Sequence, residues 1–90
     1  MQLQSNKDLL EFLLRLAAEL EASGETQFAK DVMIASRFAS GSASEFLHEA
    51  HQILTRIESS RPSVLTTEQS SDVKAAIAQI NEAFLKIGGA

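Results

Sequence analysis

The sequence contains no cysteine, tryptophan or tyrosine, and it has only one proline and four glycines in 90 residues. Without cysteine the chain has no disulfide framework, no thiolate metal ligand and no cysteine nucleophile. Long apolar runs are also missing, since Leu9–Leu10 and Phe12–Leu14 are far shorter than the ~20 residues that span a bilayer. The first residues lack the basic segment and cleavage site of a signal peptide. We therefore expect a cytoplasmic protein with no membrane partner.

Positive charge is sparse as well. Eight lysines and arginines stand against twelve acidic residues, which gives a net charge of −4. Nucleic-acid binding needs clustered basic side chains that displace counterions from phosphates, and the basic residues here are scattered. We expect no nucleic-acid partner. The first 25 residues are the most acidic part, which would either steer a basic protein partner or serve solubility alone.

What the sequence does contain is helical periodicity. With 44% hydrophobic and 22% charged residues, the chain has the composition of one folded globular domain over residues 1–90. Apolar residues recur at helical spacing, and no alternating β-branched stretch predicts a strand. We predict an all-α fold, a compact four-helix bundle-like domain with helices near residues 6–22, 25–40, 43–59 and 67–87. All four glycines and the proline lie at these boundaries.

The predicted boundaries have specific signals. Three pairs have the spacing of a capping box, in which a hydroxyl residue precedes its partner by three positions: Ser5 with Asp8, Ser42 with Glu45, and Thr66 with Gln69. Gly24 ends the first helix, because glycine readily takes the left-handed conformation required after the last turn. Gly41 stops the second helix. Because the link after Gly41 is so short, the second and third helices should be antiparallel neighbours.

The apolar faces predict the core. The first helix has apolar residues over more than half of its circumference, which suggests contact with more than one neighbour. Met33 and the phenylalanines are explained more simply as core residues than as a cofactor site, and Val64 and Leu65 should tuck under the bundle. Ile34 and Phe38 lie off the centre line of the second helix, so they either pack at the rim of the core or stay exposed. Leu85 lies off the apolar stripe of the last helix.

The histidines raise the question of a metal site. In His48–Glu49–Ala50–His51 the histidines are three apart, whereas the zinc-protease helix needs them four apart. Glu45 and His48 match one Glu-x-x-His motif of a di-iron bundle, but a second copy is missing and this one lies opposite the apolar arc. We therefore expect solvent-facing histidines and no metal ligands.

Other chemistry is equally unsupported. Histidine phosphotransfer domains are four-helix bundles with an exposed histidine, and His48 has that placement. That family puts lysine and glycine after the histidine, whereas Glu49 and Gln52 follow here, and a carboxylate repels phosphate. The serines around Ser42 are explained by capping, and the lysine of a P-loop is missing. We expect no catalytic residue and no cofactor.

Several short segments resemble small bacterial helical proteins of uncharacterised role. The segments are Ser23–Gly24–Glu25, Phe28–Ala29 and Gly41–Ser42–Ala43–Ser44–Glu45–Phe46–Leu47, and the resemblance covers roughly Leu9 to Leu54. The chain is also similar to toxin-neutralising immunity proteins, which are small, acidic and helical. The resemblance implies a bacterial source and an all-helical fold, and it transfers no functional residue.

Together these observations favour a non-catalytic protein–protein interaction module that neutralises or regulates another bacterial protein. We predict that Leu14, Ile34 and Phe38 form its contact patch. The partner is either another protein or a second copy in a structural homodimer. A histidine phosphotransfer-like domain that uses His48 is the remaining alternative.

Overall fold

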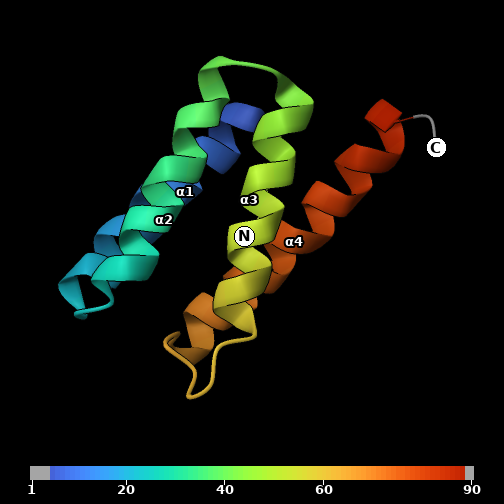
Figure 1. Cartoon of the computed structure of the whole chain (residues 1–90). Coiled ribbons are helices and arrows are strands. Elements are labelled where there is room, and N and C mark those ends of the chain that lie inside the picture. The colour runs from blue at the N-terminus through green and yellow to red at the C-terminus, as the bar shows by residue number, and fades with distance from the viewer. Residues whose placement is uncertain (1–4, 89–90) are drawn as a thin grey trace.

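The computed structural model describes the backbone of residues 5–88 and the side chains of residues 5–86. Helices make up nearly all of this part: α1 is Asn6–Ala22, α2 is Thr26–Ser36, the 3₁₀ turn η1 is Arg37–Ser40, α3 is Ala43–Glu58 and α4 is Thr67–Gly88 (Figure 1). The predicted all-α four-helix class is confirmed. No helix in the described ranges has a stretch both long enough and apolar enough to cross a membrane.

The helix starts are capped by the hydroxyl residues that the spacing predicted. The Asp8 amide donates to Ser5 Oγ at 3.2 Å, and the Glu45 amide donates to Ser42 Oγ at 3.5 Å. At the start of α4, Thr66 and Gln69 form two reciprocal hydrogen bonds. The Gln69 amide donates to Thr66 Oγ1 at 3.1 Å, and the Thr66 amide donates to Gln69 Oε1 at 2.9 Å. The capping box that opens α4 is therefore reciprocal.

The end of the second helix differs from the prediction, which had it continuous to residue 40. Its α-helical part ends at Ser36, whose Oγ donates to the Met33 carbonyl at 2.6 Å, and η1 follows. The Gly41 amide donates to the Phe38 carbonyl at 3.0 Å, a bond that closes η1. Hydrogen bonds to the carbonyl three residues back tighten the last turn of a helix.

Consecutive helices pack as neighbours around one core (Figure 1). The connector around Gly24, whose φ is +89°, turns α2 back along α1, and the Gly41–Ser42 link turns α3 back along α2. The buried apolar residues come from all four helices: Leu9, Phe12, Leu13, Leu16, Ala17, Leu20, Ala29, Val32, Ala35, Phe46, Leu47, Ala50, Ile53, Leu54, Ile57, Val73, Ala76 and Ile80. Val64 and Leu65 pack against this core from the loop, as predicted.

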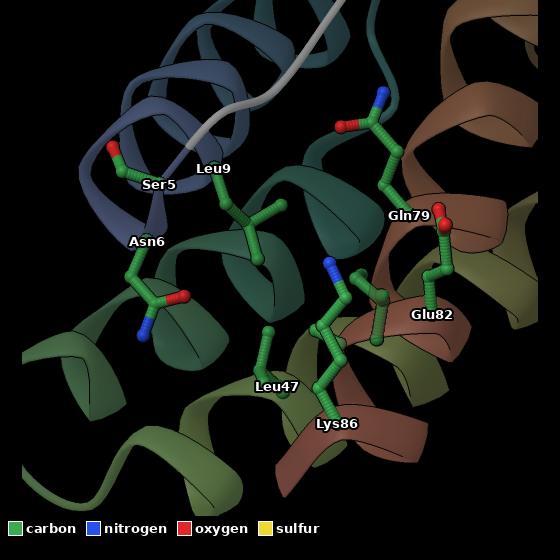
Figure 2. Close-up of a pocket in the computed structure, with 9 residues that line it drawn as sticks. Ser5, Asn6, Leu9, Leu47, Gln79, Glu82 and Lys86 are labelled. Atoms are coloured by element: carbon green, nitrogen blue, oxygen red, sulfur yellow. The ribbon is translucent and has the colours of Figure 1, made fainter.

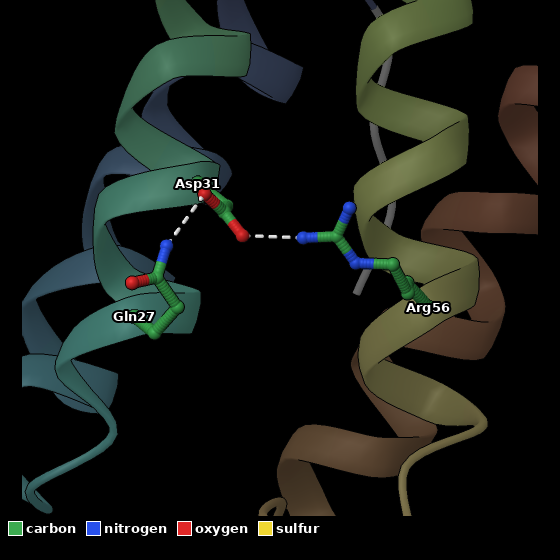
Figure 3. A network of polar contacts seen from close by, with 3 residues as sticks. All are labelled: Gln27, Asp31 and Arg56. Atoms are coloured by element: carbon green, nitrogen blue, oxygen red, sulfur yellow. Dashed lines mark hydrogen bonds and ion pairs between the residues drawn. The ribbon is translucent and has the colours of Figure 1, made fainter.

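Two polar contacts join different helices, one between α2 and α3 and one between α1 and α4. On one side Arg56 of α3 forms an ion pair with Asp31 of α2, which also accepts a hydrogen bond from Gln27 Nε2 at 3.2 Å (Figure 3). On the other side Gln69 Nε2 of α4 donates to Glu19 Oε1 of α1 at 2.9 Å. Helix α1 thus touches both α2 and α4, so the prediction that it contacts more than one neighbour is confirmed.

Candidate protein interface

The two histidines lie in different surroundings. His48 is exposed, and its Nε2 is 3.1 Å from Gln52 Nε2 one turn along α3. His51 is half-buried, and its ring meets Phe84 of α4 edge-on with the ring centroids 6.3 Å apart. His51 is therefore less exposed than predicted, because α4 packs against that flank of α3. Within the described residues, no three side chains of histidine or carboxylate type gather where they could hold one metal ion.

One hollow lies between the start of α1, the first half of α3 and the second half of α4 (Figure 2). The buried side chains of Leu9, Leu47 and Ile80 form its floor, and the polar side chains around it include Glu82 and Lys86, which carry opposite charges. Its volume is about 220 Å³. Ligand sites usually enclose about 300–1,000 Å³, with a few polar groups that converge on the ligand. The hollow therefore defines no ligand class.

The exposed large apolar side chains lie outside this hollow. Among the described residues they are Leu14 at 42% exposure, Met33 at 40%, Ile34 at 46% and Leu85 at 67%. Leu85 is alone on α4, whereas the other three belong to the hairpin of α1 and α2. The structure thus places Leu14 and Ile34 at the surface, and Phe38 is half-buried against the core.

The expectation that Met33 belongs to the core was wrong. The buried residues of α2 are Ala29, Val32, Ala35 and Ser36. At about 100° per residue, Met33 lies about 90° from the centre of that arc and Ile34 lies nearly opposite it. The small side chains of the arc let α2 approach its neighbours closely, and Met33 is left outside the contact.

The register of the hairpin places Leu14 and Met33 at the same level. Leu10 lines a shallow hollow together with Ser36, Arg37, Ala39 and Ser40, so these segments lie side by side. Leu10 is fourteen residues before Gly24, and the other four are twelve to sixteen residues after it. Residues at equal distances from Gly24 are therefore level with each other. Leu14 is ten residues before Gly24, and Met33 is nine after it.

Each helix of the hairpin carries an exposed stripe with alternating spacings of four and three residues, as in the seam of a coiled coil. The stripe of α1 consists of Lys7, Glu11, Leu14, Ala18 and Glu21, and the stripe of α2 consists of Thr26, Lys30, Met33 and Arg37. We call these nine residues together the hairpin face. All nine are exposed, and each stripe has its large apolar side chain in third place.

Both stripes lie on the side of the hairpin that is turned away from α3 and α4. The opposite flank of α1 carries Phe12 and Glu19, which border the start of α4. The opposite flank of α2 carries Asp31, which is paired with Arg56 of α3. The hairpin face therefore has no other helix of the described chain over it.

The two stripes of the hairpin face differ in charge. The α1 stripe carries Glu11 and Glu21 beside a single cation at its start, whereas the α2 stripe carries Lys30 and Arg37 and no acid. Glu11 is thirteen residues before Gly24 and Arg37 is thirteen after it, so these two opposite charges are level. One half of the face is mainly acidic, the other is basic, and Leu14 and Met33 lie between the charges.

Comparison of the chain with protein-family models, with curated proteins and with solved structures finds no match in any of the three. The resemblance to immunity proteins stays a prediction. Function is inferred from the geometry of the chain itself.

Proposed function

We propose that this protein is a non-catalytic binding module that engages a protein partner through the hairpin face. The observation that supports it is the gathering of Leu14, Met33 and Ile34 at one level of one hairpin, each at least 40% exposed. Contiguous apolar surface with a polar rim marks a protein-binding site, whereas isolated apolar side chains are ordinary. Leu85 is the isolated case here. Ile34 borders the hairpin face, and Phe38 continues from Ile34 one turn later.

The geometry revises the predicted patch of Leu14, Ile34 and Phe38. Met33 joins the patch because it is level with Leu14, and Phe38 contributes less because much of its ring packs inward. On the resemblance to immunity proteins, we propose that the module has a regulatory role in the bacterial cytoplasm.

Affinity capture tests the proposal with a matched pair of variants. The tagged chain is incubated with an extract of the native host as wild type, as Leu14→Glu and as Leu85→Glu. Both variants place a charge on an exposed leucine, but only the first is in the hairpin face. We expect wild type and Leu85→Glu to retain the same partner and Leu14→Glu to lose it, because a buried unpaired carboxylate is costly.

The partner identified in this way is then purified and titrated against each variant by calorimetry. We expect at least about a tenfold increase in Kd for Leu14→Glu, which corresponds to about 1.4 kcal/mol. Circular dichroism at 222 nm establishes that both variants stay helical. If Leu14→Glu binds every retained protein as well as wild type does, the hairpin face is not the binding surface.

A further inference from the structure

We propose that the partner of the hairpin face is a second copy of this chain, related by a two-fold axis that runs parallel to α1 and α2. This inference rests on the proposed function and specifies its partner. A homodimer interface must be complementary to itself under its own symmetry. The hairpin face meets that condition, because its acidic and basic halves lie on either side of such an axis.

The symmetry operation determines which residues meet. Rotation about an axis parallel to the helices leaves every residue at its own level and places α1 of one copy over α2 of the other. Leu14 then packs on Met33 of the second copy. Glu11 faces Arg37 of the second copy, and the same contacts recur on the other side of the axis. Lys30 lies within a turn of the level of Glu21, about 5 Å along the helix axis.

A two-fold axis perpendicular to the helices gives a less favourable pairing. It places α2 on α2 in antiparallel orientation about Met33, so that Lys30 faces Arg37 of the second copy. It also places α1 on α1, where Lys7 faces Glu21 and Glu11 faces the uncharged Ala18. Like charges that face each other across an interface oppose association. The charge order along α2 therefore selects the axis parallel to the hairpin.

The dimensions of the face set the expected affinity. From Lys7 to Glu21 the α1 stripe rises about 21 Å, and two adjacent helices are about 20 Å wide. Allowing for surface relief, each copy would bury roughly 600 Å², and the total of roughly 1,200 Å² is at the lower end for stable complexes. With one leucine and one methionine from each copy at its centre, we expect a dissociation constant on the order of 10 µM.

Sedimentation of the purified full-length chain between about 1 and about 300 µM tests the dimer. We expect a reversible monomer–dimer equilibrium for wild type and for Leu85→Glu, with Kd raised at least about tenfold in Leu14→Glu. A wild type that stays monomeric throughout overturns the second copy as partner, and so does a dimer that Leu14→Glu leaves intact. Sedimentation tests only whether the partner is a second copy, whereas the capture experiment tests whether the hairpin face binds any protein. Failure of this inference is therefore distinguishable from failure of the proposed function.

A charge-exchange experiment tests the axis. In Arg37→Glu, Glu11 faces a glutamate of the second copy, and in Glu11→Arg, Arg37 faces an arginine. We expect each variant alone to dimerise at least about fivefold more weakly than wild type. An equimolar mixture of the two variants restores an opposite pair at both places, so we expect a heterodimer with an affinity near that of wild type. A mixture that associates no better than the separate variants rules out the parallel axis.

Discussion

The two glycines that follow helices provide a stringent test of the backbone geometry. Gly24 has φ of +89°, in the left-handed region, and a Cβ built on it has no heavy atom within 4 Å. Gly41 has φ of −108°, and a Cβ there would be 3.7 Å from the Phe38 carbonyl oxygen, which is ordinary contact. Replacing each glycine by alanine therefore separates backbone strain from steric clash, because neither site is crowded.

The magnitudes follow from the two conformations. An L-residue in the left-handed conformation destabilises the folded state by about 1–2 kcal/mol. Alanine also restricts the unfolded chain more than glycine does, which stabilises the protein by about 0.4–1 kcal/mol and offsets part of that loss. Gly24→Ala should lose about 0.5–1 kcal/mol of unfolding free energy. With roughly 4–8 °C per kcal/mol for a domain of this size, its Tm should fall by about 2–8 °C. Gly41→Ala carries no left-handed strain, so its stability should stay the same or rise slightly.

Urea and thermal unfolding followed by circular dichroism at 222 nm measure both variants, with wild type in the same buffer. The same m-value in all three proteins would show that the unfolded state is comparable. The reasoning fails if Gly24→Ala is as stable as wild type, or if Gly41→Ala loses as much as Gly24→Ala does.

Two further predictions concern α4 and its contacts. Gln69→Ala removes the side-chain acceptor of the Thr66 amide and the hydrogen bond to Glu19, so it should lower the free energy of unfolding by about 1–2 kcal/mol. A change below about 0.3 kcal/mol in urea unfolding would contradict that role. His51→Ala removes an edge-on contact with Phe84 and should cost about 0.5–1.5 kcal/mol, whereas His48→Ala should stay within about 0.5 kcal/mol of wild type. Equal losses for the two histidine variants in the same assay would refute the distinction between them.

Features encoded by neighbouring residues were predictable from the sequence. The caps at Ser5, Ser42 and Thr66 were correct because a hydroxyl residue and an amide three positions later need no information from the rest of the fold. The exposure of Leu14 was also predictable, because it lies outside the densest part of the apolar arc of α1.

Features that depend on helix docking were not predictable. Met33 was assigned to the core because α2 has apolar residues on several sides, and only the close approach of Ala29 and Ser36 to neighbouring helices shows which side is covered. His51 was misjudged because its surroundings depend on the path of α4. The 3₁₀ turn at the end of α2 is formed by backbone hydrogen bonds three residues apart, which the apolar periodicity does not distinguish from a continued α-helix. The shared spacing of the two stripes was readable in the sequence, but its meaning required the register of the hairpin.

The side-chain amide of Gln69 couples two events that a helical chain can otherwise complete independently. Its oxygen holds the amide of Thr66, which starts α4, and its nitrogen holds Glu19, which is fifty residues earlier in the chain. Formation of α4 and its packing against α1 are therefore coupled through one side chain. Separation of α4 from α1 would release the Gln69 side chain and weaken the first turn of α4.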